Sequence, residues 1–209
     1  HLSIPPVIHI AGTNGKGSTI SFIHHILMSN NLNAHVYISP HLKLFNERII
    51  LSNKIIKTKK LIETLQYIKK INKNDPITFF EITTAAAFLL FSKEKADFLI
   101  LETGLGGRLD ATNVITKSLI DIITPIGIDH QDYLGKSILK ITDEKLGIIK
   151  KNSTIIISKQ KQIVKSHIRK KLSKNKNGKL FYNSHYIIIE KNINEFVLKY
   201  KNKKYKFQK

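Results

Sequence analysis

The stretch HIAGTNGKGST, residues 9–19, decides the fold of this chain. The run from Val7 to Ala11 is apolar and predicts a buried strand, and residues 18–30 carry apolar side chains at helical spacing. Glycines therefore stand between a strand and a helix. Because a helix N-terminus presents free N–H groups and partial positive charge, phosphate oxygens can approach such a loop closely. The order predicts a phosphate-binding loop.

The residue types in this loop favour a nucleotide over an ordinary tight turn. Lys16 adds a mobile cation, and Ser18 or Thr19 adds a hydroxyl for a phosphate or metal. The spacing differs from GxxxxGK[ST], because no glycine stands at the first position and Gly17 separates Lys16 from Ser18. The predicted ATP-binding residues are Gly12, Thr13, Asn14, Gly15, Lys16, Gly17, Ser18 and Thr19.

Composition limits the function classes. With 42% apolar residues and no cysteine, the chain can bury a core but cannot form disulfides, thiolate metal sites or a cysteine nucleophile. No apolar segment approaches the roughly 20 residues of a membrane-spanning helix. The formal charge of +20 is compatible with nucleic-acid binding. The lysines are scattered among Ile and Asn, however, which favours the interpretation that they lie on solvated faces of the protein. We expect a soluble, cytoplasmic monomer with no specific nucleic-acid or membrane partner, whose N-terminus is a fragment boundary.

Strand and helix patterns alternate along the chain. Further strands are predicted at residues 36–38, 97–101, 119–124 and 154–158, and further helices at 58–71, 81–93, 137–151 and 163–174. This alternation predicts an α/β fold with a mainly parallel sheet flanked by helices. From Tyr186 onward, apolar triplets flank polar turns, which predicts an antiparallel hairpin at the edge of the sheet.

Two further residues, Glu102 and His130, could carry chemistry. Glu102 follows the strand 97–101 at its carboxyl end, where ligands lie in open α/β sheets, and Mg²⁺ would be a natural partner. The alternative is a carboxylate that caps a helix. His130 follows the strand 119–124 and would lie on the same edge, although alone such a histidine is more often a surface residue. Thr78 and Glu81 have the spacing of a capping box.

Five further motifs follow one another along the chain: SPHLKLFNERI, TFFEITTAAAF, LETGLGGRLDATN, GIDHQDYLG and EKLGIIK. Together with GTNGKGS they cover residues 7–151. The chain resembles the folate branch of the Mur ligase superfamily, which comprises dihydrofolate synthase and folylpolyglutamate synthase. Residues after 151 resemble that family only in outline.

The resemblance implies roles for individual residues. Ser39, Glu102 and His130 would be metal ligands. Lys16 would be catalytic, and so would Lys145, as a carbamylated lysine that holds a second Mg²⁺; otherwise Lys145 is a solvated helix lysine. Carbamylation needs a neutral amine, and Asp143 and Glu144, if close, would favour the charged one. The implied substrate-binding residues are Thr78, Phe79, Phe80, Glu81, Arg108, Leu109, Asp110, Ala111 and Asn113; for residues 108–113 the alternative is a polar loop.

The activity that the resemblance implies is ATP-dependent ligation of L-glutamate to dihydropteroate or folate polyglutamates through an acyl phosphate, with ATP and one or two Mg²⁺ ions. Residues 1–209 would form the ATP-binding domain, without the leader and the C-terminal domain of the family. Another Mur-type ligase, of cell-wall synthesis, would share the loop but should lack SPHL and TFFE. A nucleotide-dependent nucleic-acid-binding protein would explain the charge but not Lys145.

Overall fold

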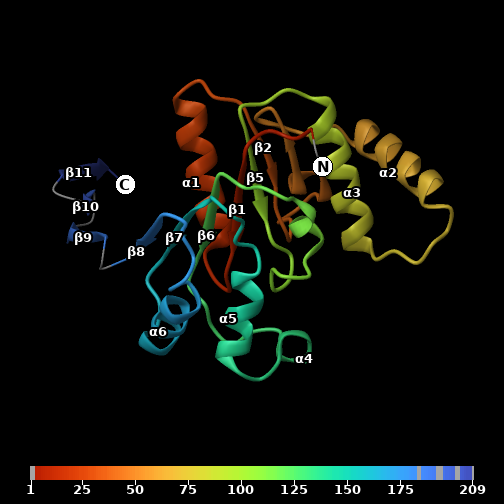
Figure 1. Cartoon of the computed structure of the whole chain (residues 1–209). Helices are drawn as coiled ribbons and strands as arrows, with labels where there is room; N and C mark the ends of the chain where they lie inside the picture. Colours follow the sequence, from red (N-terminus) through yellow and green to blue (C-terminus); the bar gives the residue numbers. More distant parts are fainter. Residues whose placement is uncertain (1–2, 183–184, 192–194, 201–202, 209) are drawn as a thin grey trace.

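The computed structural model describes residues 3–182, 185–191, 195–200 and 203–208, and its centre is an eight-stranded sheet (Figure 1). The strand order is β4-β3-β2-β5-β1-β6-β7-β8. In this order, β2, β5, β1, β6, β7 and β8 run parallel to one another. Strands β3 and β4 are antiparallel additions at the β2 edge. Their bounds are β1 Val7–Ala11, β2 Ala34–Tyr37, β3 Ile49–Leu51, β4 Lys54–Ile55, β5 Phe98–Glu102, β6 Ile120–Ile123, β7 Thr154–Ile157 and β8 Lys179–Phe181.

Helices cover both faces of this sheet. Helix α1 packs on one face through Ile20, while the other helices lie on the opposite face (Figure 1). The central strand β1 is buried along its whole length, as expected for a parallel strand covered on both sides. The helices are α1 Lys16–Ser29, α2 Thr58–Asn72, α3 Phe79–Lys93, α4 Gln131–Leu134, α5 Ile138–Leu146 and α6 Gln162–Lys171.

The carboxyl ends of β1, β5 and β6 meet at one edge of the sheet. Ile10 pairs in register with Glu102 of β5 and with Ile122 of β6. The glycine loop, Glu102 and the segment after β6 therefore lie together, although about 110 residues separate the first from the last along the sequence. This is the edge at which open α/β sheets bind ligands.

The predicted fold class is confirmed, with differences at the periphery. The antiparallel strands of the tail, β9 Tyr186–Lys191, β10 Glu195–Tyr200 and β11 Lys203–Gln208, form a separate three-stranded sheet instead of a hairpin on the main sheet (Figure 1). The helix expected to reach residue 151 ends at Leu146, and Gly147 follows it as the C-cap. A side chain would not fit at Gly147, because an added Cβ would lie 2.4 Å from the Arg108 Cβ.

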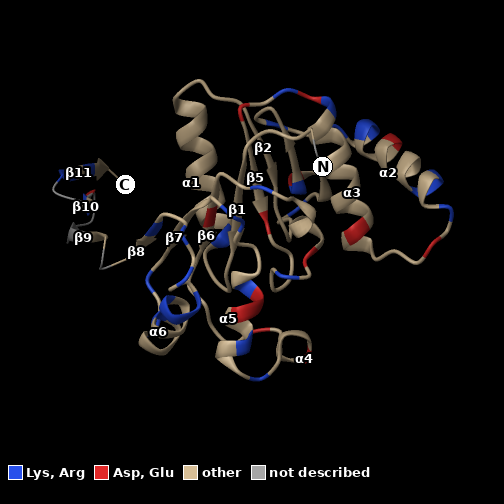
Figure 2. Ribbon diagram, in the orientation of Figure 1, with Lys and Arg blue, Asp and Glu red and all other residues tan. Residues whose placement is uncertain are grey.

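Basic residues are spread over the surface of the described chain. Lys and Arg occur on α2, α5 and α6 and in the loops, whereas along α1 the only one is Lys16 (Figure 2). Within the described residues, no helix has the length and apolar character needed to span a membrane.

Candidate functional site

Two glycines shape the turn between β1 and α1. The φ angles are 154° at Gly12 and 81° at Gly15, values that L side chains rarely adopt. A Cβ on Gly12 would also lie 1.8 Å from the Oγ1 atom of Thr124. Gly15 precedes α1 and offers no side-chain cap, and the first turn of the helix contains no acidic residue. The N–H groups at the start of α1 are therefore left for an external acceptor.

A pocket of about 670 Å³ opens in front of this helix terminus. Six predicted nucleotide-binding residues line it, from Thr13 to Ser18, together with Ser39 and Glu102. The Thr19 hydroxyl instead donates to the Gly15 carbonyl at 2.7 Å. Ser21 and His25 also line the pocket and were not predicted, although their spacing from Ser18 places all three on one face of a helix.

Two lysine amines meet at one carbonyl of the loop. The Gly12 carbonyl oxygen accepts hydrogen bonds from Lys16 Nζ at 3.2 Å and from Lys145 Nζ at 3.1 Å. Lys145 is only 3% exposed, so it is not a solvated lysine. Burial, reinforced by the nearby Lys16 charge, lowers the pKa of Lys145 from the ordinary 10.5 to about 8. An appreciable neutral fraction of this amine therefore exists close to neutral pH.

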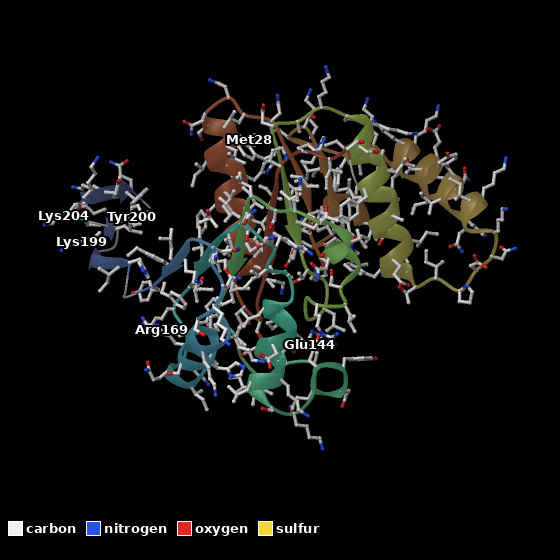
Figure 3. The ribbon with its side chains drawn as sticks, in the orientation of Figure 1. Met28, Glu144, Arg169, Lys199, Tyr200 and Lys204 are labelled. Atoms are coloured by element: carbon white, nitrogen blue, oxygen red, sulfur yellow. The ribbon has the colours of Figure 1, made fainter. Side chains whose placement is uncertain are left out.

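The acidic neighbours of Lys145 in the sequence point elsewhere. Asp143 accepts hydrogen bonds from His167 at 2.8 Å and from Lys171 at 3.0 Å on α6. Glu144 pairs with Arg108 at 3.0 Å and lies on the side of α5 that faces the loop after β5 (Figure 3). Neither carboxylate therefore holds the Lys145 amine in its charged form, contrary to what their adjacent positions in the sequence suggest.

Glu102 faces the loop from the end of β5. It is 4% exposed, its Oε1 atom lies 3.8 Å from Lys16 Nζ, and its Oε2 atom accepts a hydrogen bond from the backbone N–H of Ser39 at 2.9 Å. Burial raises the pKa of Glu102, while the Ser39 hydrogen bond and the Lys16 charge act in the opposite direction. The carboxylate is thus held at the mouth of the pocket and not on a helix terminus.

His130 follows β6 in the chain, and its contacts are local. Its backbone has a φ of 47°, and its Nε2 atom lies 3.5 Å from Asp129. Among the described residues, no three His, Asp or Glu side chains are close enough together to hold a metal ion. The structure brings Ser39 to Glu102, and a shared metal that includes His130 stays a prediction.

A second pocket, of about 310 Å³, lies next to the loop after β5. Seven predicted substrate residues line it: Thr78, Phe80, Glu81, Arg108, Leu109, Asp110 and Ala111. Its other lining residues, Leu105, Tyr133, Leu134 and Glu144, were not predicted as substrate residues, although all four lie in the quoted motifs. The capping box is confirmed, because Thr78 Oγ1 accepts from the Glu81 N–H and Glu81 accepts from the Thr78 N–H.

Two predicted substrate residues lie outside this pocket. Phe79 is exposed and packs edge-on against Phe45 at 5.5 Å. The Asn113 amide nitrogen donates to the carbonyls of Arg108 and Gly147, and its amide oxygen accepts from Lys150 Nζ at 2.7 Å. The Asn113 side chain therefore ties the loop to the segment after α5.

The fold and site define a class: an α/β protein with a phosphate-binding loop at the carboxyl edge of its sheet. The Mur ligase middle domain matches residues 10–208, and the chain belongs to this family.

Individual relatives agree with this assignment. The chain is 42% identical over 154 residues to a dihydrofolate synthase/folylpolyglutamate synthase of Haemophilus influenzae, covering 74% of this chain and 35% of the relative. It is also 42% identical over 156 residues to the Bacillus subtilis protein of the same name, covering 71% and 36%. The structure of E. coli FolC in complex with DHPP and ADP superposes with a TM-score of 0.88 at 28% identity, covering 97% of this chain and 48% of that one. The chain thus spans little more than a third of these curated relatives.

Proposed function

We propose that this chain binds MgATP at the glycine loop and forms the nucleotide-binding part of a ligase that joins L-glutamate to dihydropteroate or to folate polyglutamates. One observation carries the proposal: Lys16 and Lys145 converge on the Gly12 carbonyl, beside the buried Glu102 and the open N-terminus of α1. This is a preorganised cationic cradle for a polyphosphate. The relatives named above support the ligase assignment.

The donor set fits a magnesium ion. Mg²⁺ prefers oxygen ligands and retains several waters, so one or two protein groups beside substrate phosphates suffice. Glu102 is a buried carboxylate that lies 3.8 Å from the Lys16 amine, and its position is fixed by the Ser39 N–H. Glu102 and Ser39 would hold the ion, with His130 as the third ligand. The ion would neutralise charge on the transferring phosphoryl group.

The second pocket is the proposed place for the pteroate end of the acceptor. Phe80 offers a half-buried aromatic surface there, and Asp110 and Arg108 also line the pocket and provide one charge of each sign. Because Arg108 pairs with Glu144, the residue next to Lys145, this pocket and the phosphate loop lie against the same helix. The E. coli relative was solved in complex with both DHPP and ADP, which supports separate places for the acceptor and the nucleotide.

The chemistry assigned to these residues is charge neutralisation and positioning. A carboxylate oxygen of the acceptor attacks the γ-phosphorus of ATP, and the bond to the ADP oxygen breaks. The amine of L-glutamate then attacks the acyl carbon and releases phosphate. Lys16 offsets the charge on the phosphoryl oxygens. Attack of the neutral Lys145 amine on CO₂, with release of one proton, would give an anionic carbamate that could hold a second Mg²⁺ ion.

The test compares Lys16→Ala with Lys69→Ala, an exposed lysine of α2 that serves as the control. Titration of each variant with MgATP should show loss of binding only in Lys16→Ala, because that variant lacks the mobile cation of the loop. Glutamate ligation by the full-length parent should then be assayed with dihydropteroate and with tetrahydrofolate. Unchanged MgATP binding in Lys16→Ala would refute the nucleotide assignment.

A further inference from the structure

The glycine loop rests on the segment that follows β6. The N–H groups of Thr13 and Asn14 both donate to the carbonyl of Pro125, at 3.0 and 3.2 Å. The Thr13 hydroxyl also donates to the Gly127 carbonyl at 3.2 Å and accepts from the Gly127 N–H at 3.0 Å. The direction of the Pro125 carbonyl therefore sets the position of the first half of the loop.

One side chain from another part of the chain fixes that segment. Gln160, in the connection between β7 and α6, donates from Nε2 to the Thr124 carbonyl at 2.9 Å. Its Oε1 atom accepts from the Ile126 N–H at 3.0 Å. The Ile126 N–H belongs to the same peptide unit as the Pro125 carbonyl, and the Thr124 carbonyl belongs to the preceding unit, so the two bonds fix the direction of the Pro125 carbonyl.

These backbone groups need such a partner. Thr124 and Ile126 are 1% and 4% exposed, and Pro125 has no N–H with which to continue the ladder of β6. A buried backbone group without a hydrogen bond is strongly disfavoured, so loss of Gln160 would drive the segment to rearrange. The Thr124 side chain also lies against Gly12, so the rearrangement would reach the site of the two lysines.

We propose that Gln160 is a positioning residue for the nucleotide. It acts through Thr124, Pro125 and Ile126 on the glycine loop and does not itself line the pocket in front of α1. This inference rests on the proposed function, because it assumes that the loop binds nucleotide. Gln160 belongs to none of the motifs that identify the family, and it follows the strand 154–157.

The test uses the chain with Gln160→Leu, Gln160→Glu and, as a matched control, Gln162→Leu, an exposed glutamine at the start of α6. ADP with Mg²⁺ is titrated into each protein and the thermal midpoint is measured alongside. Gln160→Leu should weaken ADP binding roughly tenfold through the loss of two hydrogen bonds. Gln162→Leu should bind like the unchanged chain.

Gln160→Glu gives a readout that a merely structural residue would not. The charged carboxylate still accepts from Ile126 but cannot donate to Thr124, so ADP affinity relative to the unchanged chain should fall at pH 8. Relative affinity should recover towards pH 5, where a neutral carboxyl regains a donor. This variant also decides the question if Gln160→Leu fails to fold.

Two results would overturn the inference alone: Gln160→Leu with a lowered thermal midpoint but unchanged ADP affinity, or Gln160→Glu with an affinity ratio independent of pH. If the unchanged chain fails to bind ADP, the proposed function falls, and the inference falls with it.

Discussion

Replacing Lys145 by Met should stabilise the fold while removing the proposed catalytic amine. The lysine is buried, and its folded pKa of about 8 lies below the ordinary 10.5. Met has a similar length and no charge to desolvate, and the Gly12 carbonyl keeps the Lys16 amine as a donor. The buried cation is therefore a cost to folding that the variant escapes.

The size of this gain follows from proton linkage. Each unit by which a pKa differs between the folded and unfolded states is worth about 1.36 kcal/mol. Because the folded pKa is the lower one, the cost is fully present below pH 8 and disappears as the pH rises towards 10.5. Lys145→Met should be more stable than the unchanged chain by about 3 kcal/mol at pH 7 and by about 2 kcal/mol at pH 9.

Urea unfolding of both proteins at pH 7, 8 and 9 measures this difference, with Lys140→Met, an exposed lysine of the same helix, as the control. Lys140→Met should show no such gain, because its side chain is solvated in both states. The free energies of unfolding of Lys145→Met and the unchanged chain could instead differ by the same amount at pH 7, 8 and 9. That result would show that burial does not disfavour the charged amine, and it would refute the prediction.

Three further outcomes are expected. Gly12→Ala should abolish MgADP binding in a titration and lower the free energy of unfolding in urea by more than about 2 kcal/mol, because its Cβ would overlap the Thr124 hydroxyl. Burial lowers the pKa of His35 to about 4, so its contribution to stability is present above about pH 6.5 and is lost as the pH falls towards 4. Between pH 7 and 5 the free energy of unfolding in urea should fall by about 2 kcal/mol more in the unchanged chain than in His35→Gln. Lys150→Met should weaken dihydropteroate binding and leave MgADP binding unchanged in parallel titrations. The substitution removes the hydrogen bonds from Lys150 to Asn113, in the loop after β5 beside the second pocket, and does not alter the glycine loop.

Local patterns made much of the fold predictable. The strand, glycine loop and helix at the N-terminus are encoded within 24 consecutive residues, from Val7 to Asn30, and the Thr78–Glu81 box marks the start of α3. The hairpin of β3 and β4 was missed, because its strands have only three and two residues. Its turn is formed by Ser52 and Asn53, both at positive φ, and the asparagine was the available signal.

The site was less predictable, because sequence proximity does not give side-chain direction. Asp143 and Glu144 directly precede Lys145 in the sequence, yet Asp143 binds His167 and Glu144 binds Arg108. Asn113 belongs to a motif beside the second pocket, but its amide is fully used within the protein. Gln160 lies in none of the quoted motifs. Its proposed role depends on the position of the connection after β7 relative to the end of β6, which the local sequence does not give.

The charges around the glycine loop suit the polyphosphate that the proposed function assigns to this site. Lys16 and Lys145 share one carbonyl, the open terminus of α1 adds partial positive charge, and Glu102 is the one carboxylate that the described structure pairs with Lys16, at 3.8 Å. The lowered pKa of Lys145 is partly a consequence of this surplus, because Lys16 disfavours a second charge beside it. A polyphosphate in the pocket would remove that repulsion and hold the amine protonated. The proposed carbamylation of Lys145 needs the neutral amine, so it would be most favourable before nucleotide binds.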